Sequence, residues 1–178
     1  MTRVEVNDHL ARVDGKLVYS RFIIWRGVEF GGMEERELPP GPWHDESDHV
    51  EFEHLGHPCI LHRGPTGAWC GYVAVPPGHP WHGRGFDWKN GVDADVHGGI
   101  TYANACQGSI CHVAKPGEPD DVWWLGFDCN HLGDMDAQKI IEDGGVYGHD
   151  GMWPRQYRTV GYVRRETEKL AEQAKEAA

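Results

Sequence analysis

Short runs of β-branched and aromatic residues, separated by glycine, proline, asparagine and aspartate, make up most of the hydrophobic pattern. Runs of this kind predict strands that are bounded by turns. Within residues 1–35 the strongest run is Lys16–Trp25, where we expect a first strand or hairpin. Residues 58–135 form the expected core, with a weaker run at 109–113. Four stronger runs predict strands there: 59–62, Trp69–Val75, 95–103 and 122–128.

The C-terminal segment has a helical rather than an alternating pattern. Residues on one face recur at spacings of three, four and three: Val160, Val163, Thr167 and Leu170. We therefore expect a helix over residues 154–178, with Pro154 at its first position. Arg164 and Glu168 are spaced i,i+4 on its solvent side, where opposite charges stabilise a helix. Strands followed by one late helix predict an α+β fold, mainly an antiparallel sheet with a C-terminal helix.

The length of 178 residues fits a single domain over residues 1–178. Between the first strand and the core, residues 36–57 are rich in proline, acidic side chains and histidine. The prolines at residues 37–42 exclude regular structure there. We expect the acidic, histidine-bearing part of this segment, residues 44–54, to be solvated and mobile; the alternative is a lid that closes over a site.

The charge and the cysteine count limit the classes of function. The net charge is −11, which argues against binding to a nucleic-acid backbone, because such proteins need a basic face. The N-terminus lacks an apolar signal region and no run of 18 apolar residues occurs, so we expect a cytoplasmic protein without membrane contact. The number of cysteines, five, is odd, which favours free thiols over disulfides in that compartment.

Alternation along two of the predicted strands indicates a polar surface. In the run 95–103, His97, Gly99 and Thr101 share one face, and in the run 122–128 so do Trp124, Gly126 and Asp128. If the two strands pair, these residues form a ligand-binding face. Its two glycines would form the bottom of a shallow trough, and its tryptophan would stack on a ring of the ligand. The alternative is a solvated face whose glycines mark bulges.

The loop after the last predicted strand has the spacing of a metal site. Asp128, His131 and Asp134 lie three residues apart, and carboxylate with imidazole suits Zn, Mn or Fe. We expect the metal ligands to be His97, Asp128, His131 and His82, the last from the motif His79-Pro80-Trp81-His82. Asp134 would be a further ligand or would orient His131. The alternatives are a turn or helix cap at the aspartates and ordinary surface histidines.

Three segments together resemble a family of proteins from actinobacterial phages and prophages. They are Gly71–Pro76 with Gly78-His79-Pro80, Val96–Tyr102, and Trp123–His131 with Gly133-Asp134, and the likeness covers about residues 68–170. The resemblance implies a phage-encoded protein made in the host cytoplasm, and it implies no activity.

These observations lead to three hypotheses of function. The first is a metal-dependent hydrolase of a phosphorylated or nucleotide-like small molecule, with His97 and Asp134 as its catalytic residues. The second is a binding protein without catalysis, which sequesters a host nucleotide signal or docks a host protein. The third is a structural phage component whose C-terminal helix assembles with further copies or with another protein.

Overall fold

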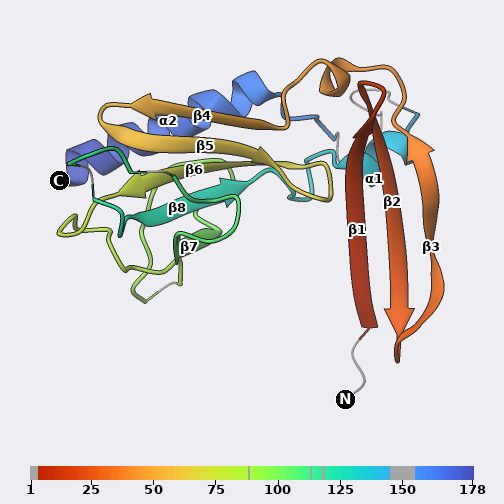
Figure 1. Ribbon diagram of the computed structural model, residues 1–178, viewed down its shortest axis with the longest axis horizontal. Helices are drawn as coiled ribbons and strands as arrows, with labels where there is room; N and C mark the ends of the chain where they lie inside the picture. The colour runs from red at the N-terminus through yellow and green to blue at the C-terminus, as the bar shows by residue number, and fades with distance from the viewer. Residues whose placement is uncertain (1–3, 88, 113, 118, 145–154) are drawn as a thin grey trace. The chain divides into compact units, whose positions relative to one another are not determined.

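The computed structural model describes residues 4–87, 89–112, 114–117, 119–144 and 155–178 (Figure 1). The chain divides into two compact units. Unit 1 comprises Met1–Glu46, Arg63–Ala68 and Leu132–Thr159, and unit 2 comprises Ser47–His62, Trp69–His131 and Val160–Ala178. Each unit has an antiparallel sheet, and a helix ends the chain, so the fold is α+β as predicted. That the whole chain is one domain stays a prediction.

Unit 1 is built on a three-stranded antiparallel sheet in the order β1-β2-β3 (Figure 1). The strands are β1 (Val4–Val13), β2 (Lys16–Trp25) and β3 (Val28–Glu37), and β2 has the predicted bounds. Two-residue turns, Asp14-Gly15 and Arg26-Gly27, join them. All four of these residues have positive φ, between 49° and 82°. Such turns match the twist of paired strands, so the turn residues set the register of both hairpins.

The rest of unit 1 contains a 3-10 turn, η1 (Pro42–His44), and a short helix, α1 (Ala137–Glu142). The Asp136 side chain caps α1 by accepting from the Lys139 backbone N–H at 2.9 Å. Helix α1 was not predicted, because six residues are too few to show a helical period.

A buried arginine organises the same unit. The Arg63 guanidinium donates to a Glu46 carboxylate oxygen at 2.9 Å, to the Tyr157 hydroxyl at 3.0 Å and to the Trp43 carbonyl at 3.2 Å. A buried charge needs such partners, since an unpaired one would be strongly destabilising.

Unit 2 contains a five-stranded antiparallel sheet in the order β4-β5-β6-β8-β7. The strands are β4 (His49–His54), β5 (His57–Arg63), β6 (Trp69–Val75), β7 (Tyr102–Ala105) and β8 (Trp123–Asp128). Three of the four stronger runs in the predicted core are thus strands close to their expected bounds. About half of the acidic segment 44–54 is a strand, β4, which was not predicted from the sequence. Alternation of Val50, Phe52 and the intervening acidic residues supplied the missed signal.

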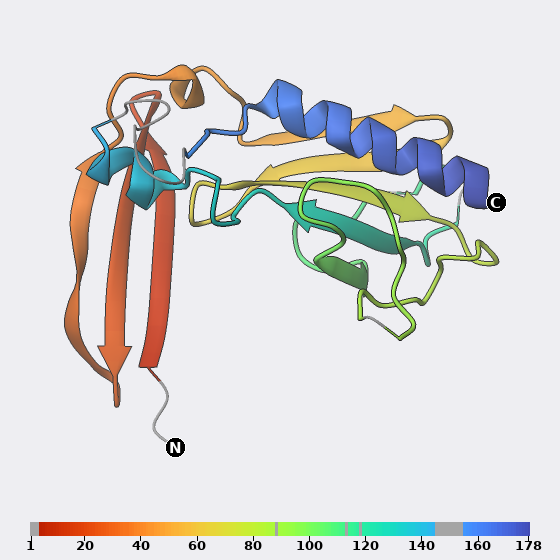
Figure 2. The same ribbon diagram turned by 180° about the vertical axis from the view of Figure 1, so that it is seen from behind.

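Helix α2 (Val160–Ala177) packs on one face of this sheet along β6 (Figure 2). A Cβ at Gly71 would overlap the Thr167 hydroxyl, so this glycine permits the close approach. The predicted helix face is buried at Val163, Thr167 and Leu170. The predicted start is too early, because residues 155–159 are not helical and Pro154 lies outside the described residues. Of the helices described, none is long and apolar enough to cross a membrane.

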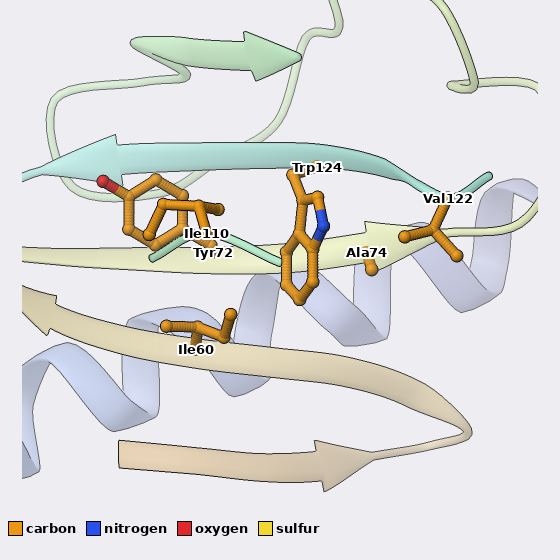
Figure 3. Close-up of a cluster of buried hydrophobic side chains, with 6 residues drawn as sticks. All are labelled: Ile60, Tyr72, Ala74, Ile110, Val122 and Trp124. Carbon is orange, nitrogen blue, oxygen red and sulfur yellow. The ribbon is translucent and has the colours of Figure 1, made fainter. Parts of the chain in front are cut away.

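A hydrophobic cluster covers the opposite face of the sheet (Figure 3). Its buried members come from three strands and from the connections beside them: Ile60, Tyr72, Ala74, Ile110, Val122 and Trp124. The central strands β6 and β8 therefore have apolar neighbours on both faces, which explains why their sequences are nearly continuous in hydrophobicity.

One cysteine pair departs from the expected free thiols. Cys106 and Cys111 form a disulfide across a tight loop that the bridge between Gln107 and Ile110 closes. The loop sets their Cα atoms 4.5 Å apart, within disulfide range, which sequence spacing alone did not show. Cys59, Cys70 and Cys129 are free, as predicted. The weak run at 109–113 forms this loop rather than a strand, and its last residue lies outside the described part.

The buried His57 makes the stability of unit 2 depend on pH. Its Nδ1 lies 3.0 Å from the Ala74 carbonyl oxygen, and burial lowers the pKa of the His57 imidazole. An unfolded histidine has a pKa of about 6.5, so below that pH the unfolded chain takes up more protons than the folded one. This contribution to stability is complete above about pH 6.5 and is lost as the pH falls through the lower folded pKa.

We predict that the free energy of unfolding in urea falls between pH 7 and pH 5, and that it falls less for His57→Gln. Circular dichroism at matched pH values measures both. Equal losses in the two proteins would contradict the assignment to His57.

Candidate metal centre in unit 2

The segment that carries His97 is a turn rather than a strand. Residues 95–101 are not part of a strand, although the Thr101 backbone N–H donates to the Gly126 carbonyl oxygen at 2.9 Å, and β7 begins only at Tyr102. Gly98 and Gly99 both have positive φ, at 67° and 81°. Two such residues in succession turn the chain away from the extended conformation, so the strand predicted over 95–103 is correct only in its last part.

The register of β7 on β8 changes the predicted polar face. The two strands pair, as the hypothesis requires, and Tyr102 lies opposite Gly126, so Tyr102 shares the face on which Thr101 was expected. A shift of one residue moves side chains to the other face of a sheet. The Tyr72 ring covers Gly126, because a Cβ there would overlap that ring. At Gly126 the Tyr72 ring therefore occupies the space of the expected trough.

Trp124 lies inside the hydrophobic cluster rather than on an open face (Figure 3). Its side chain is fully buried, and its ring meets the ring of His112 edge-on at 6.0 Å between centroids. The prediction that Trp124 stacks on a bound ring stays a prediction. Burial on both faces of β8 is the reason that alternation misread it as a surface residue.

Helix α2 holds the His97 turn through two contacts. The His97 backbone N–H donates to a Glu166 carboxylate oxygen at 2.8 Å. The His97 ring nitrogen Nδ1 lies 2.9 Å from the Tyr162 hydroxyl, and the two rings are nearly perpendicular at 5.6 Å. Tyr162 and Glu166 are spaced i,i+4 and so lie on one side of the helix. Sequence reasoning missed both, because it assigned that segment only a packing or an assembly role.

His131 follows β8 and meets His97 at the turn. The two rings are 5.3 Å apart between centroids, with an angle of 64° between their planes. The Gly98 backbone lies directly against the His131 ring, because a Cβ at Gly98 would overlap it. One ring nitrogen of each histidine lies within 4.8 Å of the other, so this pair can hold a metal ion. Two members of the predicted ligand set are thus brought together.

Asp128 and Thr101 meet at the end of β8. The Thr101 hydroxyl donates to one Asp128 carboxylate oxygen at 2.7 Å, and the Asn130 backbone N–H donates to the other at 3.0 Å. The predicted neighbourhood of Thr101 and Asp128 is therefore present. Its contacts give the carboxylate a turn-forming role, which is common for aspartate.

The other two histidines of the predicted linker lie elsewhere. His82 has its Nε2 2.8 Å from the Asp121 carbonyl oxygen and its ring beside Trp123. His79 is buried, with its Nε2 2.9 Å from the Ala174 carbonyl oxygen. Close groups of three or more metal-binding side chains within the described ranges include neither His82 nor Asp128. Each of these two histidines therefore has a backbone carbonyl as its partner, and the predicted part of His82 as a metal ligand stays a prediction.

Asp134 belongs to unit 1. Its buried carboxylate accepts from the Arg158 guanidinium at 2.8 Å. Asp134 follows His131 by three residues in the chain. Its predicted part as a further ligand or orienting carboxylate stays a prediction.

Comparison with known proteins adds no relative. No family model, no curated protein and no solved structure matches this chain. The resemblance to proteins of actinobacterial phages therefore stays a prediction, and the candidate site is argued from its own geometry.

Two neighbouring glycines give a matched test of the contact with His131. Gly98→Ala and Gly99→Ala both place a side chain at positive φ, which costs each about 1 kcal/mol. At Gly98 the added methyl group also overlaps the His131 ring, whereas at Gly99 no heavy atom lies within 4 Å.

We predict that Gly98→Ala lowers the free energy of unfolding by roughly 1–3 kcal/mol more than Gly99→Ala, as overpacking does. Urea denaturation measures the difference. Equal destabilisation by the two variants would show that His131 does not lie against the turn.

Proposed function

We propose that unit 2 binds a divalent transition metal ion, Zn, Mn or Fe, through His97 and His131, and acts as a metal-dependent hydrolase. Its substrate would be a phosphorylated or nucleotide-like small molecule. The observation that carries the proposal is the pairing of two half-buried imidazoles from segments 34 residues apart, 5.3 Å between ring centroids. Imidazole is the side chain most often used for such ions.

The contact between His97 and Tyr162 supports this assignment. If Nδ1 of His97 carries the proton and donates to the tyrosine oxygen, Nε2 becomes the nitrogen that binds metal. A partner of this kind fixes the tautomer and the orientation of the ring. Tyr162 is therefore a positioning residue, and Glu166 adds to the same effect by holding the His97 backbone.

The chemistry that a bound metal supplies is a lower pKa of a coordinated water, which provides a nucleophile near neutral pH. Two histidines leave coordination positions for water and substrate, as catalytic sites require. The overall charge of −11 disfavours an anionic substrate at long range. A metal ion would supply the local positive charge that a phosphate needs.

Metal binding is tested first, on the full chain. We predict about one equivalent of Zn²⁺ or Mn²⁺ per chain by titration calorimetry, and stabilisation against heat that a chelator reverses. His97→Ala and His131→Ala should each lose this binding. His82→Ala is the matched control, since His82 contacts Asp121 and Trp123 instead, and it should bind as the original protein does.

Loss of binding in His82→Ala with retention in His97→Ala would contradict the proposed ligands. Hydrolysis is tested separately, by phosphate release from ATP and from bis(p-nitrophenyl) phosphate with the metal present. Metal binding without release from either compound would refute the hydrolase and leave the metal site standing.

Tyr162→Phe tests the positioning role, because it removes only the hydroxyl that contacts His97. We predict metal affinity about 10–100-fold weaker, the usual effect of removing such a partner. The unfolding midpoint of the metal-free protein serves as the control for damage to α2. Unchanged affinity would show that the hydroxyl does not orient the ring.

A further inference from the structure

A second feature of unit 2 is a cavity of about 380 Å³ on the sheet face that carries the hydrophobic cluster. Its apolar lining comes from Phe52, Pro58, Ile60 and Trp124. A smaller hollow of about 180 Å³ adjoins it and shares Pro58 and His112. The larger volume lies in the range of sites for small molecules.

The strand register explains why acidic groups stand beside this apolar lining. Glu51 lies opposite Ile60 in the pairing of β4 with β5, and Glu53 lies opposite Pro58. Directly opposed residues of an antiparallel pair share a face, so both carboxylates point to the cavity side. His112 and Lys115 line the cavity from the connection between β7 and β8.

The Cys59 thiol also lines this cavity, but it brings no covalent chemistry. Burial raises the pKa of the Cys59 thiol to about 12, so the sulfur stays protonated. A protonated thiol is a weak nucleophile, and the cavity is therefore suited to reversible binding.

Two buried nitrogens of residues that line the cavity have no hydrogen-bond partner among the residues that the structure describes. They are Nε1 of Trp124, whose side chain is fully buried, and Nδ1 of His112. Figure 3 shows the indole nitrogen on the side of the ring toward Ala74 and Val122, two residues that line the smaller hollow. An indole N–H is a donor only, and burying it without an acceptor is costly, so it calls for an acceptor from outside the protein.

The carboxylates that line the cavity indicate which polar group the ligand carries. Glu51 and Glu53 are exposed carboxylates, which accept hydrogen bonds and attract amines. The apolar lining around the Trp124 ring suits a flat ring system. The apolar lining, the indole N–H and the carboxylates are three features that a ligand has to match. Such a ligand has an aromatic ring, a ring atom that accepts a hydrogen bond from Trp124, and an amino group that donates to a carboxylate.

We infer that this cavity binds an amino-substituted heteroaromatic ring, the chemistry of adenine or cytosine, with the Trp124 indole N–H donating to a ring nitrogen. The indole N–H is buried, so binding requires a neighbouring side chain to move, and we assign that movement to the His112 ring, which packs edge-on against Trp124. Glu51 or Glu53 accepts from the amino group. The inference is independent of the metal site, because it uses none of its ligands.

The experiment follows the indole N–H signals of the eight tryptophans in ¹H–¹⁵N spectra while adenine is added to the full chain. The Trp124 signal is assigned by its loss in Trp124→Phe. We expect it to move downfield with saturation, and we expect purine, which lacks the amino group, to bind about tenfold more weakly. Glu51→Gln combined with Glu53→Gln should remove that preference for adenine.

Trp123→Phe is the matched control variant, because its indole N–H already donates to the Arg84 carbonyl at 2.9 Å. Adenine should bind Trp123→Phe as tightly as the original protein, and Trp124→Phe about tenfold more weakly. An unmoved Trp124 signal at millimolar adenine would overturn the inference. Equal affinity for adenine and purine would also overturn it, and that comparison needs no variant.

Discussion

The antiparallel pairing of β8 with β6 on one side and with β7 on the other is the constraint on which the candidate site depends. Tyr102 opposite Gly126 fixes where β7 begins, and Cys70 opposite Asp128 fixes where β8 ends. Because the strands run in opposite directions, the start of one lies at the end of the other. The turn before β7 and the loop after β8 therefore meet, and they carry His97 and His131.

Burial of the central strands on both faces explains the other features of unit 2. Helix α2 covers one face at Gly71, and the hydrophobic cluster around Trp124 covers the other. The helix then supplies Tyr162 and Glu166 to the histidine turn. Within the described part of the chain, the cluster leaves the Trp124 donor without a hydrogen-bond partner beside a cavity. One sheet thus supports two candidate sites with different chemistry, a pair of imidazoles and a cavity for a flat ring.

The positions of the strands could be predicted from the sequence better than the face of the sheet on which each side chain lies. Lys16–Trp25 and Trp69–Val75 were located to the residue, because β-branched runs bounded by turns are a local signal. The faces of residues 95–103 and 122–128 were assigned by alternation, which assumes one solvated side and unbroken strands. The strand over 95–103 is interrupted, because the adjacent glycines at 98 and 99 form a turn. The strand over 122–128 has no solvated side at Trp124, because that side chain is buried. His97 and His131 were still predicted together, since the pairing of the strands was correct.

The central claim is that a metal ion lies between His97 and His131. Anomalous diffraction at the zinc absorption edge, from crystals grown with Zn²⁺, tests it most directly. We predict one strong peak at about 2.0–2.1 Å from a ring nitrogen of each histidine, the usual zinc–nitrogen distance. A fully occupied peak at other histidines, with none between these two, would contradict it.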